Sequence, residues 1–115
     1  MLSKETTNIS ENISLLLSII LSSIHIDLIK KIYLFGSYSY GKPNFDSDYD
    51  ICVIIDEQCN KRDIYIQIMN NLLDNNIYKC DLLVKKENIF LKKINDNKNS
   101  IESIIFSKGT ILYEK

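Results

Sequence analysis

The chain has no strong excess of charge of either sign, because its 14 basic and 15 acidic residues give a formal net charge of −1. The strong positive field that drives nucleic-acid binding is therefore missing. Three lysine pairs, Lys30-Lys31, Lys85-Lys86 and Lys92-Lys93, are expected at solvated helix or turn positions rather than along a phosphate track. Nucleic acid is accordingly not an expected partner.

Cysteine and histidine are scarce. The three cysteines lack metal-ligand spacing, and Cys52 and Cys80 fall inside apolar runs, where a free cysteine behaves as a small hydrophobic residue. An odd number of unpaired thiols suits a reducing, cytoplasmic compartment. The single histidine, His25, lies near the end of the first predicted helix, where a surface or capping role is expected. No zinc site is predicted.

Long apolar runs are also missing. The most apolar segment, near the N-terminus, is interrupted by serines, preceded by acidic residues and lacks an A-x-A-like cleavage site, so neither a signal peptide nor a membrane span is expected. The length of 115 residues suits a single domain over residues 1–115, with little room for a separate substrate domain. An enzyme of this size would have to take its specificity for a second substrate from that substrate itself, which favours a protein partner.

The apolar spacing predicts a small α/β (α+β) protein with a mixed sheet flanked by helices. Asn8 and Glu11 have the spacing of a capping box, and apolar residues at helical intervals from Ile9 to Ile24 predict an amphipathic helix. The further expected elements are strands over 31–35, 49–55, 78–84 and 110–113, a crossover helix over 60–73, and two helices within 86–106 separated by the polar stretch 95–100.

The run GSYSYGKPNFDSDYDICVII carries the most specific chemical signal. Gly36-Ser37 directly follows a predicted strand, and a small turn of this kind exposes backbone N–H groups that can hold nucleotide phosphates. Asp48 and Asp50 stand two residues apart at the entrance of the next strand, so their side chains project to the same side. Paired carboxylates in that position predict a magnesium site beside a phosphate loop.

A third carboxylate is expected, because two-metal phosphoryl chemistry commonly places one carboxylate between the ions. Asp81 is the best candidate, since it lies in the strand-like run YKCDLLV. An unpaired charge inside a buried strand is costly, and a metal ion bound by the neighbouring strand would supply a reason for it.

The order Gly-Ser, ten residues, Asp-x-Asp and a lone Asp in a later apolar strand resembles the DNA polymerase beta-like nucleotidyltransferase superfamily. Within it, the chain is most similar to the minimal nucleotidyltransferases, and the resemblance runs from about Leu28 to the closing segment FSKGTILYE. Many members of that group are antitoxins encoded beside a HEPN-domain toxin. The resemblance implies transfer of AMP from ATP, with Mg²⁺, onto a tyrosine of that toxin, and a possible complex with it.

The resemblance also implies residue roles. Asp48, Asp50 and Asp81 would hold two magnesium ions and form the catalytic set, Asp81 would assist deprotonation of the acceptor hydroxyl, and Gly36-Ser37 would grip the outer phosphates. Tyr40 departs from the family pattern, which has arginine there, and Lys42 is close enough in sequence to substitute.

Two alternatives stay open from the sequence. One is an antibiotic-modifying nucleotidyltransferase of the aminoglycoside type, which would ordinarily need added structure to hold its acceptor. The other is an antitoxin with weak catalysis that inhibits its partner by contact, an alternative that the altered loop at Tyr40 favours.

Overall fold

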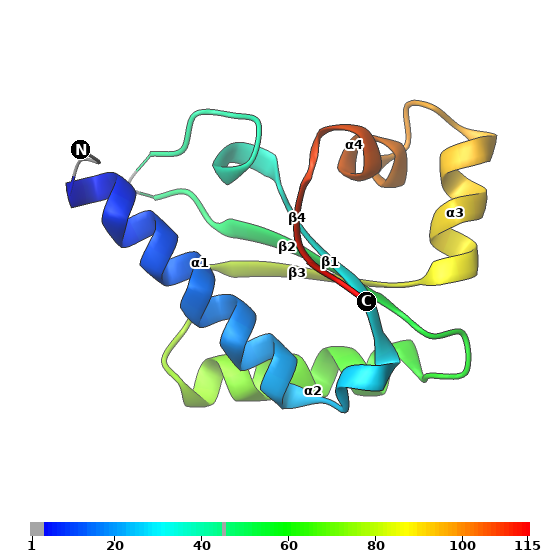
Figure 1. The fold of residues 1–115 in the computed structure, drawn as a ribbon, viewed down its shortest axis with the longest axis horizontal. Helices are drawn as coiled ribbons and strands as arrows, with labels where there is room; N and C mark the ends of the chain where they lie inside the picture. Colours follow the sequence, from blue (N-terminus) through cyan, green and yellow to red (C-terminus); the bar gives the residue numbers. More distant parts are fainter. Residues whose placement is uncertain (1–3, 45) are drawn as a thin grey trace.

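The computed structural model describes residues 4–44 and 46–115. Its four strands form one mixed sheet in the order β3-β2-β1-β4, with β2 parallel to β3 and β1 antiparallel to both of its neighbours (Figure 1). The elements are α1 Lys4–Ser23, β1 Ile29–Phe35, β2 Tyr49–Ile55, α2 Lys61–Asp74, β3 Cys80–Lys86, α3 Glu87–Asp96, α4 Ile101–Lys108 and β4 Thr110–Glu114, with short 3₁₀ turns at Ile26–Leu28 and Gly36–Tyr38.

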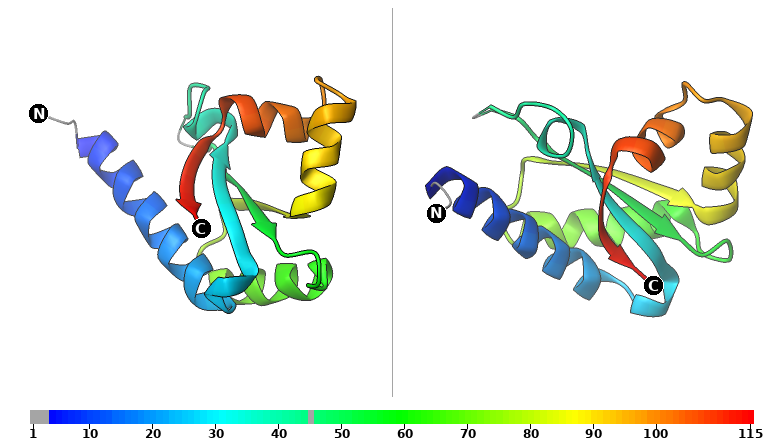
Figure 2. Two further views of the ribbon diagram at one scale, coloured as in Figure 1. Left: turned by 45° about the vertical axis from the view of Figure 1, so that its right-hand side comes forward. Right: turned by 45° about the horizontal axis from the view of Figure 1, so that its top comes forward.

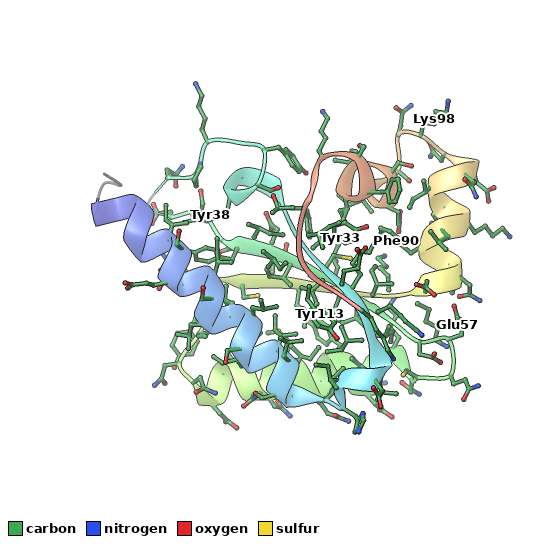
Figure 3. All side chains as sticks on the ribbon, in the orientation of Figure 1. Tyr33, Tyr38, Glu57, Phe90, Lys98 and Tyr113 are labelled. Atoms are coloured by element: carbon green, nitrogen blue, oxygen red, sulfur yellow. The ribbon has the colours of Figure 1, made fainter. Side chains whose placement is uncertain are left out.

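Helices cover both faces of the sheet, so the fold has three layers (Figure 2). Alternate side chains of β2 divide between the faces: Ile51 and Val53 pack in the larger core beneath α1 and α2, whereas Cys52 and Ile54 pack beneath α3 and α4. On the second face the ring centroids of Tyr33 and Phe90 lie 5.9 Å apart. Both residues are labelled in Figure 3. The predicted fold class is confirmed.

Most predicted elements are confirmed, with shifted ends. β2 has the predicted bounds, and α2 begins one residue later than expected because Asn60 is its cap, its side chain accepting from the Asp63 N–H. β1 begins two residues before the predicted start. β3 begins two residues after its predicted start at Tyr78, because its hydrogen-bonded partner β2 begins only at Tyr49. Tyr78 is therefore outside the sheet, and it is 71% exposed.

The predicted capping box at Asn8 is wrong. Helix α1 already begins at Lys4, so Asn8 lies in its second turn and cannot be the residue that starts the helix. The residues before Asn8 include neither proline nor glycine, so nothing in them stops the helix from extending toward the N-terminus. His25 does have a capping role, since its ring accepts a hydrogen bond from the Asp27 N–H in the turn after α1.

The lysine pairs are only partly where the sequence placed them. Lys30-Lys31 and Lys85-Lys86 lie in strands rather than in helices or turns, because they stand at the ends of apolar strand runs. Lys30 and Lys31 are ion-paired, with Lys30 Nζ 3.6 Å from an Asp56 oxygen and Lys31 Nζ 2.8 Å from a Glu114 oxygen. Lys92-Lys93 lies in α3, as expected for a solvated helix position.

The three cysteines are free thiols, with Cys52 buried and the other two half-buried. Burial raises the pKa of Cys52 to about 12, so this thiol is un-ionised at neutral pH. Among the described residues, no helix combines the length and the apolar character that crossing a membrane requires.

The core of α2 gives a direct stability test. Ile68 is fully buried, and Ile68→Ala should lower the free energy of unfolding by about 2–5 kcal/mol, because it removes apolar contacts and leaves a cavity. Ile66→Ala, on the exposed side of the same helix, is the matched control and should stay within about 0.5 kcal/mol. Urea unfolding measures both values, and equal losses would contradict the assigned packing of α2.

Candidate active site

The turn after β1 is shaped by the glycines at its two ends. Gly36 has a φ of 70°, which favours glycine, and its carbonyl accepts hydrogen bonds from the Ser39 and Tyr40 N–H groups, each at 3.1 Å. A Cβ on Gly36 would overlap the Asp50 carboxylate. A Cβ on Gly41 would lie 2.8 Å from the Ser37 Cα. The loop is therefore folded tightly on itself and against β2.

Two stacked tyrosines fix the loop to the body of the protein. The rings of Tyr38 and Tyr49 lie 4.1 Å apart, and the Asn12 side chain of α1 donates a hydrogen bond to the Tyr49 hydroxyl at 3.2 Å. The Tyr38 hydroxyl donates to the Ser47 carbonyl at 3.5 Å, and Figure 3 shows Tyr38 between the loop and α1. Burial raises the pKa of Tyr38, with Tyr49 and Asp48 adding to the effect.

The structure brings the predicted carboxylates to one face of the sheet. Asp50 and Asp81 are direct partners in the parallel register of β2 and β3, and both share the face of Cys52 and Leu83, beneath α3 and α4. Asp48 directly precedes β2, and its charge acts on Asp50. The pKa of Asp50 is raised above its ordinary value by burial first, then by the charges of Asp81 and Asp48. The three acids are thus electrostatically coupled.

Asp81 differs from expectation in one respect. The sequence placed this carboxylate inside a buried strand, but the residue is exposed, although Leu82 and Val84 of the same edge strand are buried. Its charge therefore needs no metal ion to compensate for burial. What marks the site is the proximity of Asp81 to Asp50, since like charges directly opposite each other destabilise a sheet.

The donor set fits a magnesium ion that is shared with substrate phosphates, rather than one that is enclosed by protein ligands alone. Within the described residues, no three histidine, cysteine or acidic side chains are close enough together to hold a metal ion by themselves. Mg²⁺ in phosphoryl-transfer sites is usually held by one or two carboxylates, with waters and substrate phosphates completing the octahedron. Asp48 and Asp50 offer such carboxylates, and Asp50 lies directly against Gly36 of the loop.

The predicted phosphate ligands occupy different positions. Gly36 and Ser37 lie half-buried next to the carboxylates, and the Ser37 hydroxyl makes no hydrogen bond to another described residue. Lys42 is exposed further along the loop, with no ion pair to another described residue, so the structure does not bring it into the carboxylate cluster. Tyr40 is 44% exposed.

One cation next to β3 was not singled out by the sequence analysis. Lys79 directly precedes β3, and its carbonyl accepts the Tyr49 N–H at 2.9 Å. Its Nζ lies 4.0 Å from an Asp46 oxygen.

Comparison with known proteins agrees with this geometry. The family model described as "Polymerase beta, Nucleotidyltransferase" matches residues 18–115. A protein of Methanocaldococcus jannaschii that is named as a protein adenylyltransferase is 35% identical over 85 residues, which cover 74% of this chain and 79% of that protein. The chain therefore belongs to the polymerase beta nucleotidyltransferase family, and it is a nucleotidyltransferase.

Solved structures show the same fold. A toxin–antitoxin crystallised with AMP-PNP superimposes with a TM-score of 0.56 at 20% identity, covering 85% of this chain and 73% of that one. A mutant of the MntA–HpeT toxin–antitoxin gives a TM-score of 0.55 at 17% identity, with 89% and 73% covered. A Sulfolobus solfataricus structure described as a nucleotidyltransferase gives 0.56 at 16% identity, with 87% and 75% covered.

The coupling of the acids predicts a pH-dependent stability in metal-free protein. Because the folded pKa of Asp50 is raised, the folded state binds more protons than the unfolded state just above pH 3.8, and stability falls as the pH rises through that window. Asp81→Asn removes one cause of the raised pKa. It should increase the free energy of unfolding at pH 7 by less than about 1 kcal/mol, because both groups are partly exposed.

Urea unfolding in EDTA at pH 7 and at pH 3 measures this effect. The gain should shrink at pH 3, where Asp50, with its raised pKa, no longer carries the charge that Asp81 repels. Glu11→Gln, an exposed change on α1, should give no comparable gain at pH 7. A gain for Asp81→Asn that persists undiminished at pH 3 would show that it does not arise from charge.

Proposed function

We propose that this chain is a magnesium-dependent protein adenylyltransferase that moves AMP from ATP onto a tyrosine hydroxyl of a HEPN-domain toxin, and so acts as its antitoxin. The observation that carries the proposal is the register that sets Asp50 opposite Asp81, with Gly36 packed against the Asp50 carboxylate. Support comes from the relative named as a protein adenylyltransferase and from the fold neighbours that are toxin–antitoxin structures, one of them with an ATP analogue.

The carboxylate roles have a parallel in one neighbour. The MntA–HpeT structure is of a mutant in which two aspartates, two positions apart, are replaced by glutamate. That spacing is the spacing of Asp48 and Asp50 here, which supports assigning both residues to the catalytic centre. In this assignment Asp48, Asp50 and Asp81 would hold magnesium together with the phosphates of ATP, and the metal would supply neutralisation of charge on the attacking and leaving oxygens.

The chain's own groups have separate roles in the reaction. Backbone N–H groups and the hydroxyl at Gly36-Ser37 bind the outer phosphates, and the absence of a side chain at position 36 lets the loop pack directly against the Asp50 carboxylate, so phosphates held by the loop lie beside that carboxylate. Asp81, exposed at the sheet edge, accepts the proton of the tyrosine hydroxyl. The tyrosine oxygen forms a bond to the α-phosphorus as the bond to pyrophosphate breaks, so AMP stays on the acceptor.

The defining test is intact-mass spectrometry of the protein encoded by the neighbouring gene after incubation with this chain, Mg²⁺ and ATP. We expect a mass gain of one or more AMP units with the wild type and none with Asp48→Asn. Asp56→Asn is the matched control, because it makes the same change just past the far end of β2 and should leave the gain intact. Peptide mapping then locates the modified residue.

Each other result assigns a different function. A stable complex without a mass gain would favour inhibition by contact, in keeping with tyrosine rather than arginine at position 40 of the loop. A gain that survives Asp48→Asn would remove that carboxylate from the mechanism. The absence of both a stable complex and a mass gain would point to a small-molecule acceptor.

Nucleotide binding can be tested without an acceptor. Magnesium with ATP should raise the melting temperature of the wild type more than that of Asp48→Asn, because ligand binding to the folded state stabilises it and the variant lacks one metal-binding carboxylate. Differential scanning fluorimetry with Mg²⁺ alone, ATP alone and both together separates the contributions. Equal shifts for the two proteins would contradict the metal site.

A further inference from the structure

A basic groove of about 690 Å³ lies at the C-terminal end of β3, whereas Asp81 lies near the N-terminal end of that strand. Its cations come from three elements that are separate in sequence, and the one acidic group lining it, Glu102, comes from α4. The cations are Lys61 and Arg62 of α2, Lys85 and Lys86 of β3, and Lys93 of α3. The sequence analysis expected the lysine pairs to be separately solvated, whereas the fold gathers three of their members here.

The charge of this groove is largely uncompensated. Glu102 is only 4% exposed and its Oε2 lies 3.3 Å from Lys85 Nζ, so these two charges neutralise each other. The remaining cations, Lys61, Arg62, Lys86 and Lys93, have no acidic partner within 4.0 Å among the described residues. By contrast, Lys30 and Lys31 of β1 are both ion-paired. Four unpaired cations in a chain of net charge −1 favour an anionic ligand.

Apolar side chains and an open sheet edge accompany the cations. Tyr65 and Ile89 also line the groove and are 41% and 48% exposed. Within the described residues β3 pairs only with β2, so the backbone N–H and C=O groups of its outer edge are available to an added strand. Such a surface suits an extended peptide in which acidic and apolar residues alternate.

We propose that this groove docks an acidic, extended segment of the acceptor protein along the edge of β3. This inference rests on the proposed function and adds to it a site that selects the acceptor. Asp81 and Lys85 are four residues apart and point to the same face, so about 13 Å of strand separates the groove from the catalytic carboxylate. A segment of about four residues spans that length, which lets the groove hold the partner while its tyrosine reaches Asp81.

A protein segment fits this surface better than nucleic acid does. A phosphate chain that continued from the groove along β3 would run into the carboxylates of Asp48, Asp50 and Asp81, which repel it. An acidic peptide can place its charges at the lysines alone and present neutral residues further along the strand.

The test measures binding without catalysis, in the Asp48→Asn protein and without ATP, so that failure of adenylyl transfer and failure of docking are distinguished. The probe is a fluorescein-labelled peptide of ten residues in which Glu and Val alternate. Its binding is measured by fluorescence anisotropy at physiological salt. Adding Lys86→Glu and Lys93→Glu should weaken binding at least tenfold. Lys85 is left unchanged because its partner Glu102 is buried.

The matched control carries Lys92→Glu and Lys98→Glu, two exposed lysines of the same region that do not line the groove and that make the same change in net charge (Lys98 is labelled in Figure 3). It should bind within about twofold of the parent. A peptide with Ser in place of Val should bind more weakly, because Tyr65 and Ile89 lose their apolar contacts.

Three results would overturn the proposal. The first is no binding of the Glu-Val peptide to the parent protein, and the second is an equal loss in the groove variant and its control. The third is tighter binding of a ten-nucleotide single-stranded RNA that depends on Lys86 and Lys93, which would assign the groove to nucleic acid. Thermal melts of each variant check that its fold is intact.

Discussion

The parallel pairing of β2 with β3 is the constraint on which the proposed catalytic centre depends. It sets Asp50 opposite Asp81, although like charges in that position oppose pairing. The register is held instead by buried apolar partners further along the same strands, where Ile51 faces Leu82 and Val53 faces Val84. A slip of one residue would move all of these side chains to the wrong face, so the core enforces the proximity of the acids.

The loop that is proposed to bind phosphate depends on β2 as well. Gly36 follows β1 with a positive φ and lies against the Asp50 carboxylate, so the loop and the carboxylates form one unit rather than two adjacent sites. The Tyr38–Tyr49 stack and the hydrogen bond from Asn12 extend that unit to α1. The first helix therefore supports the loop, although it supplies none of the proposed ligands.

Much of this arrangement could be predicted from the sequence, because the apolar periods of β2 and α2 are strong and the Asp-x-Asp spacing places two carboxylates on one side of a strand. Three features could not. The start of α1 at Lys4 lies before the apolar period that begins at Ile9, the exposure of Asp81 depends on how the sheet is covered, and the basic groove arises only when α2, β3 and α3 pack together. The last two depend on tertiary contacts that local patterns do not encode.

The exposed position of Asp81 has a consequence for the competition between acceptors. A carboxylate at the rim of the sheet is reachable by a folded protein, but it is equally reachable by water, the acceptor present at the highest concentration. Nothing in an open rim distinguishes hydrolysis of ATP from transfer of AMP, so the preference must come from holding the correct hydroxyl in place for longer than a water molecule stays. In the proposed reaction, the share of ATP that is spent on transfer rather than on hydrolysis is therefore a property of the complex with the acceptor rather than of the chain alone.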